Sequence, residues 1–429
     1  MTVGALILTA CANSGSDSDE AGIAAVESSE VDAGAGSESE TDQSDDQQAP
    51  DDQGSNGGQE QRLPDPGFDY STVDYDAEPA ADALRGDRVN ANFPPPIVEP
   101  SLITSGGPPP DGIPPIDSPN FITLAETDFL NDQEAVIAVE IEGEARAYPV
   151  QILIWHEIVN DQFGDVPVAI TYCPLCNSAL AFDRRLGNRT LDFGTSGELY
   201  QSALVMYDRQ TGSLWAHFTG QGLVGHYAGA ELEFIAAQTI SFEEFKKAYP
   251  DGLVLSRDTG ADRRYGQNPY PGYDDETSDP IGAFFNGAID RTLLAKARIV
   301  GIADEAGSAA VRLDDLVGQP VIPVTDGGRN LVVFHQPGLN STLDSGLVDD
   351  GRDVGQTGVF VAAAEDGTEL TFASSDSGFI DDQTGSTWSI VGTAIDGPLA
   401  GQRLEAVSHL DTFWFAWATY RPDTVIIEP

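Results

Sequence analysis

The segment Asp208-Arg-Gln-Thr-Gly-Ser-Leu-Trp215 recurs further along the chain as Asp382-Gln-Thr-Gly-Ser-Thr-Trp388, with one residue fewer. The similarity continues downstream, where Ala228-Gly-Ala-Glu-Leu232 corresponds to Ala400-Gly-Gln-Arg-Leu404. Matched blocks that keep their order along the chain are the signature of a duplicated unit. The sequence therefore predicts two diverged copies of one unit in tandem.

Each copy closes on the same pair of elements. The segments 239–251 and 411–423 both carry apolar residues at helical spacing, and both end in a proline followed by an aspartate. A short apolar run comes next, Leu253-Val-Leu255 in the first copy and Val425-Ile-Ile427 in the second. We therefore expect each copy to end in an amphipathic helix and a strand.

Upstream of these elements, both copies contain short apolar runs separated by turn-forming dipeptides. Gly187-Asn188 divides the segment 179–193 in the first copy, and Asp366-Gly367 divides the segment 359–372 in the second. Glycine beside Asn or Asp supplies the positive φ that a tight hairpin turn needs. The predicted fold is therefore mainly β with a few helices (α+β), built from two tandem diverged copies of a β-rich unit.

The composition divides the chain into four regions. Residues 12–115 are rich in Ser, Asp, Glu and Gly and then in Pro, so they cannot bury enough apolar surface to offset the entropy of ordering. We expect them to form a disordered acidic tether. It would follow a signal at residues 1–11 and precede the first repeat at 116–290 and a degenerate second repeat at 291–429.

The net charge limits the partners. The 429 residues include 70 acidic and 21 basic side chains, which gives a formal net charge of −49. A surface this acidic repels the phosphate backbone of nucleic acid, so nucleic acid is excluded as a partner. We expect a small molecule or a protein as the partner, and the sequence does not identify it.

The N-terminus predicts a location outside the cytoplasm. Residues 3–10 form an apolar run that is too short to span a bilayer and is closed by small residues. The segment Leu8-Thr-Ala-Cys11 is typical of a bacterial lipobox. We expect an extracytoplasmic lipoprotein of the cell envelope, anchored to the membrane through lipidated Cys11. An ordinary cleaved signal with a chance cysteine is the alternative.

The two remaining cysteines stand together in Tyr172-Cys-Pro-Leu-Cys176-Asn177. A run of β-branched residues ends at Tyr172, so Cys173 is expected at a strand end or in a tight turn, where Pro174 fixes φ. Two thiols at this spacing can share a metal ion or a disulfide. The second copy has His335 and no thiol at this place. We therefore expect the chemistry in the first copy, with the second copy as a structural partner that closes over the site.

His156 and Met206 are the candidate partners of the thiols. His156 lies in a block of polar residues, and Met206 is the only methionine after Met1. Thiolates with His and Met suit Cu(I), whereas two Cys and one His with a water or carboxylate suit Zn(II). We predict a metal site of Cys173, Cys176, His156 and Met206, with copper ahead of zinc. His217 and His226 follow turn-rich sequence and are weaker candidates.

Two alternatives to a metal site stay open, and with them the question whether the chain is an enzyme. Oxidising compartments favour disulfides, so Cys173 and Cys176 can form a structural disulfide clip in an envelope module, although so small a loop adds little stability. A thiol–disulfide oxidoreductase is the other alternative. The usual redox thiol lies at a helix N-terminus, whereas the residues after Cys176 indicate a hairpin strand.

A cationic loop follows the first copy's last strand. Asp258-Thr-Gly260 is followed by Arg263, Arg264 and Tyr265. The loop fits an anion-binding or substrate-binding role, and it equally fits packing and salt bridging.

The stretch from Arg146 to Tyr273 resembles DUF3179, a large bacterial and archaeal family without an assigned activity. The resemblance implies a secreted or membrane-anchored protein whose most distinctive element is the cysteine pair. His217 departs from the family pattern, where we expect a polar uncharged residue. The motifs that carry the resemblance are His156-Glu-Ile-Val-Asn-Asp161, Tyr172-Cys-Pro-Leu-Cys176, Phe193-Gly-Thr-Ser-Gly197, Leu204-Val-Met-Tyr-Asp208, Ser213-Leu-Trp215, Phe218-Thr-Gly-Gln221 and Leu255-Ser-Arg-Asp-Thr-Gly260.

Overall fold

The structure is a computed structural model that describes residues 67–79, 82–86, 88, 90–304 and 307–429. The expected signal with Cys11, and the expected tether up to residue 66, lie outside the described residues. The fold is mainly β with a few short helices, which confirms the predicted class. No helix in the described ranges is long and apolar enough to cross a membrane.

The first repeat begins with a sheet around one hairpin. The hairpin strands β3 and β4 pair antiparallel, β15 adds antiparallel to β3, and β16 adds parallel to β4. β2 completes the edge beside β16. A short helix follows β4, and another connects β15 to β16. The bounds are β2 Phe121–Thr123, β3 Ala135–Ile141, β4 Glu144–Pro149, α1 Val150–Leu153, β15 Ala237–Ser241, α2 Phe242–Ala248 and β16 Leu253–Leu255.

The second repeat begins with a sheet of the same topology. Its hairpin is β17 and β18, with β26 antiparallel to β17 and β27 parallel to β18. A helix again follows the hairpin and another again connects the two outer strands, as the duplication predicts. The bounds are β17 Arg298–Asp304, β18 Gly307–Arg312, α3 Leu313–Gly318, β26 His409–Phe413, α4 Trp414–Tyr420 and β27 Val425–Ile427.

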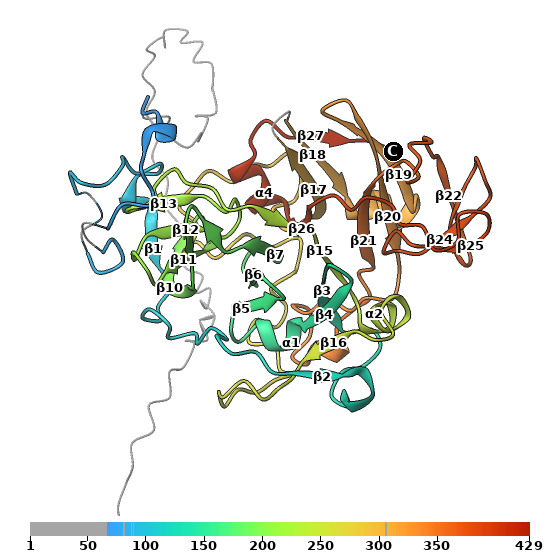
Figure 1. Ribbon diagram of the computed structural model, residues 1–429, viewed down its shortest axis with the longest axis horizontal. Helices are drawn as coiled ribbons and strands as arrows, with labels where there is room; N and C mark the ends of the chain where they lie inside the picture. The colour runs from blue at the N-terminus through green and yellow to red at the C-terminus, as the bar shows by residue number, and fades with distance from the viewer. Residues whose placement is uncertain (1–66, 80–81, 87, 89, 305–306) are drawn as a thin grey trace, which may run out of the picture. The chain divides into compact units, whose positions relative to one another are not determined.

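Two further sheets also occur in both repeats (Figure 1). The antiparallel order β5-β6-β7, extended by β14, corresponds to β19-β20-β21. The order β10-β11-β12-β13 corresponds to β22-β23-β24-β25. The bounds are β5 Ile158–Phe163, β6 Val166–Cys173, β7 Ser178–Asp183, β10 Phe193–Tyr200, β11 Ala203–Asp208, β12 Leu214–Ala216, β13 Gly222–Val224, β14 Phe234–Ile235, β19 Val321–Asp326, β20 Arg329–Gln336, β21 Gln356–Val361, β22 Phe372–Ser375, β23 Gly378–Asp381, β24 Thr387–Trp388 and β25 Ala394–Asp396.

The expected hairpins at the turn dipeptides are smaller than predicted. Gly187-Asn188 joins only the two-residue strands β8 (Arg185–Leu186) and β9 (Arg189–Thr190). The longer strands on either side pair elsewhere, β7 with β6 and β14, and β21 with β20. The prediction was wrong here because local turn chemistry does not reveal which non-local edge a strand pairs with.

The prediction of a disordered tether was also wrong for the described residues between 67 and 115, which contain a strand and buried apolar side chains. β1 (Ile103–Ser105) pairs antiparallel with β10, and it follows the 3-10 helix Pro100–Leu102. Ile97 and Val98 are buried in an apolar cluster with residues of β11 to β13. Composition predicted disorder, but these few apolar side chains cover a sheet that the first repeat has already formed.

A buried aspartate ties the turn between β11 and β12 together. Asp208 Oδ1 accepts the backbone N–H of Thr211 at 2.6 Å, and Asp208 Oδ2 accepts the indole Nε1–H of Trp215 at 2.9 Å. The Thr211 hydroxyl adds a third hydrogen bond to Oδ2 at 2.9 Å and lies 2.7 Å from Ser213 Oγ. The Asp208 carboxylate, the Thr211 hydroxyl and the Trp215 indole N–H therefore all have hydrogen-bond partners within the turn.

The second repeat forms the same network. Asp381 accepts the N–H of Thr384 at 2.6 Å and the indole N–H of Trp388 at 2.9 Å, and the Thr384 hydroxyl again lies 2.7 Å from a serine, Ser386. Asp381 therefore occupies the place that the sequence comparison assigned to Asp382, and the two segments match without a deletion. Because Asp381 and Asp382 are adjacent, the sequence alone does not distinguish them, whereas the hydrogen bond to Trp388 does.

Backbone and amide hydrogen bonds dock the repeats against each other. The Gln238 side chain on β15 donates to the carbonyls of Thr357 at 2.7 Å and Ile390 at 3.0 Å. In return the Ser241 N–H donates to the Gln356 side chain at 2.9 Å. The two copies therefore share hydrogen bonds across their junction.

Replacing either buried aspartate should destabilise the protein. In Asp208→Ala and in Asp381→Ala the indole and threonine N–H groups lose their acceptor, so we expect the free energy of unfolding to fall by about 2–4 kcal/mol. Asp396→Ala, an exposed position on β25, is the control and should change it by about 0.5 kcal/mol or less. Urea denaturation measures all three, and an Asp381→Ala effect no larger than the control would contradict the assignment.

Candidate functional site: a buried thiol pair

The cysteine motif forms the turn of the β6–β7 hairpin. Cys173 ends β6 and pairs directly with Ser178, the first residue of β7. Asn177 closes the turn with a left-handed φ of 49°, which asparagine tolerates better than most residues. The predictions that Cys173 lies at a strand end and that a hairpin strand follows Cys176 are confirmed. Both cysteines are free and buried.

The Cys173 sulfur lies among hydrogen-bond donors. Burial raises the pKa of its thiol, but hydrogen bonding from the Cys176 thiol and from the amides of Leu204, Cys176 and Leu175 outweighs burial and lowers this pKa below its ordinary value. Hydrogen bonds to the charged form favour it. Cys173 is therefore the thiol of the pair that ionises first.

Cys176 has the opposite tendency. Burial raises the pKa of its thiol well above the ordinary value, and the neighbouring Cys173 raises it further. Cys176 Sγ lies 3.0 Å from Ser178 Oγ, which lies 2.8 Å from His217 Nε2. The second thiol therefore keeps its proton and sits at one end of a chain of polar groups.

His217 ends this chain as a neutral imidazole. Burial lowers its pKa to about 3, so it carries no charge at neutral pH. Its Nδ1 is buried without a hydrogen-bond partner. An unpaired lone pair costs less than an unpaired N–H, so Nε2 carries the proton and donates to Ser178 Oγ. The Ser178 hydroxyl then donates to Cys176 Sγ.

Glu157 places a second neutral group beside the thiols. Burial, and then the charge of Cys173, raise the pKa of this carboxyl to about 8. Its backbone carbonyl accepts the Tyr172 N–H at 2.8 Å, and its φ is 60°. Left-handed backbone at a residue other than glycine is strained and concentrates at functional sites. Because its pKa is about 8, the Glu157 carboxyl is mostly protonated at neutral pH.

The turn between β10 and β11 borders Cys173. Cys173 Sγ lies 4.0 Å from the carbonyl of Ser202, and both Gln201 and Ser202 have left-handed φ angles, 52° and 65°. The side-chain oxygens of Gln201 and Ser202 are buried and lack hydrogen-bond partners. Strain and unsatisfied polar atoms therefore gather next to the reactive sulfur, a pattern associated with function.

The second repeat closes over the thiol turn, as expected. The carbonyl of Cys176 accepts the Thr412 hydroxyl at 2.6 Å and the Phe413 N–H at 3.2 Å, both at the end of β26. The carbonyl of Leu175 accepts the Tyr273 hydroxyl at 3.0 Å. Residues from both repeats therefore hold the turn in place.

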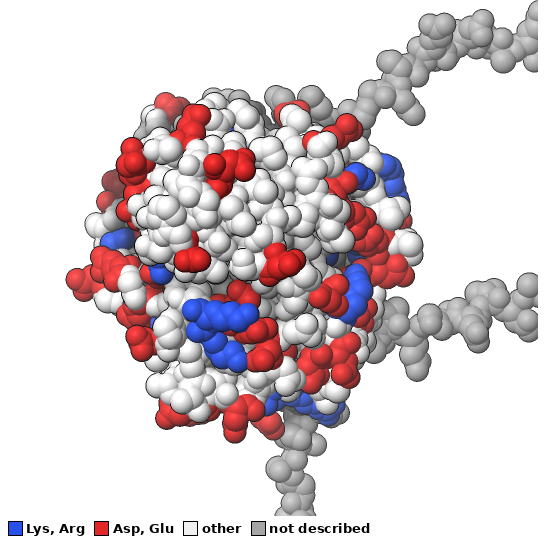
Figure 2. Space-filling view, turned by 90° about the vertical axis from the view of Figure 1, so that its right-hand side faces the viewer, with Lys and Arg blue, Asp and Glu red and all other residues white. Residues whose placement is uncertain are grey.

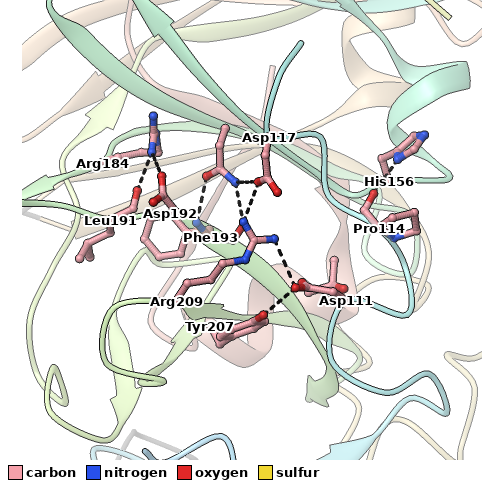
Figure 3. A network of polar contacts seen from close by, with 12 residues as sticks. Asp111, Pro114, Asp117, His156, Arg184, Leu191, Asp192, Phe193, Tyr207 and Arg209 are labelled. Atoms are coloured by element: carbon pink, nitrogen blue, oxygen red, sulfur yellow. Dashed lines mark hydrogen bonds and ion pairs between the residues drawn. The ribbon is translucent and has the colours of Figure 1, made fainter. Parts of the chain in front are cut away.

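The structure does not bring the four predicted metal ligands together. His156 Nδ1 lies 2.6 Å from the Pro114 carbonyl (Figure 3), and His156 Nε2 lies 2.6 Å from the Tyr265 hydroxyl. Both ring nitrogens therefore already have protein partners. Met206 is buried on β11 between Thr195 and Trp215. Within the described residues, no three His, Cys, Asp or Glu side chains are placed to hold a metal ion.

Figure 3 also shows how residues 111–117 reach this region. Asp111 accepts the Tyr207 hydroxyl at 2.7 Å, and Asp117 accepts Arg209 at 2.7 Å. Pro114, which lies between them, presents its carbonyl to His156. His156 is therefore part of the anchorage of this segment.

Sequence reasoning missed the polar partners of the thiols. Ser178 lies outside the candidate residues, and His217 is a weaker candidate in the sequence because it follows turn-rich sequence and departs from the family pattern. The available signal was local: His217 directly follows Leu214-Trp-Ala216, a run that indicates a buried strand. Glu157 was noted only as part of the polar block around His156.

The chain matches the family described as "Protein of unknown function (DUF3179)" over residues 110–424. It belongs to this family. The match covers both repeats, so the duplication is part of the DUF3179 unit. No curated protein and no solved structure matches the sequence.

Replacing His217 should make the free energy of unfolding depend less steeply on pH at acidic pH. An unfolded histidine binds a proton near pH 6.5, whereas folded His217 does so only near pH 3. Its contribution to stability is therefore full above pH 6.5 and is lost as the pH falls toward 3, at about 1.4 kcal/mol per pH unit. In His217→Gln, which keeps a donor to Ser178, we expect this part of the slope to vanish in urea denaturation. An unchanged slope would contradict the assignment.

Proposed function

We propose that this DUF3179 protein is a thiol–disulfide redox protein in which Cys173 is the attacking thiolate and Cys176 the resolving thiol. The observation that carries the proposal is the unequal surroundings of the pair: Ser178 Oγ, itself 2.8 Å from His217, lies 3.0 Å from Cys176 Sγ. In agreement, the donors around Cys173 lower its pKa, whereas burial raises the pKa of Cys176. A thiolate is the nucleophile in disulfide exchange, and its partner must stay available for the second step.

The reaction balances with a disulfide as the co-reactant. The Cys173 thiolate attacks one sulfur of the substrate, so a mixed disulfide forms and the other half leaves as a thiolate. Cys176 then attacks Cys173 Sγ and releases the second half. The Cys176 proton goes to one of the leaving thiolates. The substrate gains two electrons, and the chain ends with a Cys173–Cys176 disulfide.

Two neighbouring groups support these steps. Ser178 donates to Cys176 Sγ and is itself held by His217, so negative charge that develops on Cys176 is stabilised. The protonated carboxyl of Glu157 can supply a proton to a leaving thiolate beside Cys173. Because both sulfurs are buried, the substrate we propose is a small disulfide rather than a protein disulfide.

We further propose that the reaction takes place in the cell envelope, with the chain anchored through lipidated Cys11. The lipobox-like segment Leu8–Cys11 and the preceding apolar run support this location. Thiol–disulfide chemistry is common outside the cytoplasm, which agrees with the location.

The experiment is a redox titration of the full-length chain in a Cys11→Ser background. We expect the wild-type pair to pass from two free thiols to none in one two-electron step as the ratio of a small disulfide to its thiol rises. Cys176→Ser should accumulate the mixed disulfide on Cys173, and Cys173→Ser should react much more slowly. Alkylation followed by mass spectrometry measures all three. Equal reactivity of the two single variants, or a wild-type pair that stays reduced throughout, would refute the proposal.

Copper(I) binding is the second candidate, and the pairing of two neighbouring thiols with a favoured thiolate supports it. The two sulfurs do not fit Zn(II), which takes four ligands in structural sites, whereas soft thiolates select Cu(I). Elemental analysis of the same preparation separates the candidates. Copper that is bound in stoichiometric amount and lost in Cys173→Ser would favour this function over redox exchange.

A further inference from the structure

The starting observation is a local excess of positive charge in an acidic protein. Figure 2 shows one face on which acidic side chains are scattered and basic ones form a few small groups. Most described arginines lie within 4.0 Å of a carboxylate, as Arg209 and Arg298 do. In the ranges that the structure describes, the arginines without such an ion pair are Arg257, Arg263, Arg264 and Arg421.

Three of these four arginines belong to the loop that follows β16. Arg257 donates to the side-chain oxygen of Gln151 and lies over the Phe129 ring at 4.7 Å. Arg263 has its Nε buried without a partner. Arg264 is exposed. The sequence left salt bridging open as the role of this loop, and the structure contains no such bridge for any of the three.

Hydroxyl groups and a histidine lie near the guanidinium groups of Arg257 and Arg263. The Tyr265 hydroxyl lies 2.6 Å from His156 Nε2 and 2.5 Å from Thr259 Oγ1. Because His156 Nδ1 faces the Pro114 carbonyl, Nδ1 carries the ring proton and Nε2 accepts from Tyr265. The charge of Arg263 acts on both rings: after burial, it contributes to the lowered pKa of His156, and it opposes the raised pKa of Tyr265.

The carboxylates nearest in sequence do not neutralise the loop. Asp258 and Asp262 are exposed, and neither lies within 4.0 Å of an arginine nitrogen. Glu134 forms no ion pair with Arg257, because the Gln151 side chain contacts both and its amide donates to Glu134. Three guanidinium groups therefore face solvent or neutral partners, in a chain where nearly every other arginine is paired.

We propose that Arg257, Arg263 and Arg264 form a binding subsite for a small, multiply charged oxyanion of the phosphate type. The planar guanidinium group can donate two parallel hydrogen bonds to the oxygens of such an anion. Three guanidinium groups together carry enough positive charge to balance more than one negative charge on the anion. Cations without an ion-pair partner attract anions to this loop, whereas the acidic remainder of the surface repels them.

This subsite goes beyond the redox proposal and does not depend on it. The arginine subsite and the thiol pair are connected through two residues that are adjacent in sequence. His156 faces Tyr265 of the arginine loop, whereas Glu157 lies beside Cys173. The subsite uses neither thiol. Its test is therefore made without any redox reaction.

Trp155 offers a direct readout. Its indole N–H donates to the Gln267 carbonyl at 3.1 Å, so it is attached to the same loop. It is the one tryptophan of five, all of them described, that is not buried. Quenching of tryptophan fluorescence by neutral acrylamide therefore reports mainly on Trp155.

The probe is inorganic phosphate, titrated into the full-length chain at fixed ionic strength made up with chloride. We expect a saturable change in acrylamide quenching, and sulfate should compete. The variant Arg263→Gln/Arg264→Gln should bind phosphate at least about tenfold more weakly, because two charge-assisted contacts are lost. Arg257 is left intact because it also packs on Phe129. The control Arg291→Gln removes a paired, exposed arginine elsewhere and should bind as the wild type does.

Three results would overturn the proposal. The first is the absence of a saturable phosphate effect in the wild type by both quenching and calorimetry. The second is equal weakening in the Arg291→Gln control, which would show general charge screening. The third is unchanged affinity in the double variant, once circular dichroism has shown that it is folded.

Discussion

The structure depends on the burial of one peptide turn between two copies of the same unit. The carbonyl of Cys176 accepts hydrogen bonds from Thr412 and Phe413 of the second repeat. This contact removes the thiol turn from water, so hydrogen bonds and desolvation decide which sulfur ionises. The duplicated sheets provide the rigid frame, and the buried aspartates in each copy fix the turns that the sheets present.

Within that frame the site contains one favoured charge and several neutral groups. Donors surround Cys173, whereas Cys176 is connected through Ser178 to the neutral His217. Glu157 is also mostly neutral, because burial, and then the charge of Cys173, raise its pKa. A negative charge on a single sulfur is the state that a nucleophilic thiol needs, and neutral neighbours avoid further charge repulsion. The loop that carries the arginines without an ion pair reaches His156, the neighbour of Glu157, through the Tyr265 hydroxyl.

Local and repeated features were predictable from the sequence, and non-local ones were not. The duplication, the β class and the position of Cys173 at a strand end follow from patterns within short windows. The role of Asp381 was missed because Asp382 stands beside it, and only the hydrogen bond to Trp388 distinguishes them. Residues 67–115 were assigned to a tether because composition cannot register a sheet on which Ile97 and Val98 are buried. His217 follows β12 and meets Ser178 on β7, a strand of a different sheet, so this contact arises from the packing of segments that are distant in sequence.

The central claim is that the Cys173 thiol ionises at a lower pH than an ordinary cysteine, whereas the Cys176 thiol ionises at a higher pH. The ultraviolet absorbance of the thiolate, followed from mildly alkaline to mildly acidic pH in the full-length Cys11→Ser chain, tests it most directly. The account predicts one thiolate that persists below the ordinary cysteine pKa, remains in Cys176→Ser and is absent from Cys173→Ser. A single titration at the ordinary cysteine value, or a thiolate signal that survives in Cys173→Ser, would contradict it.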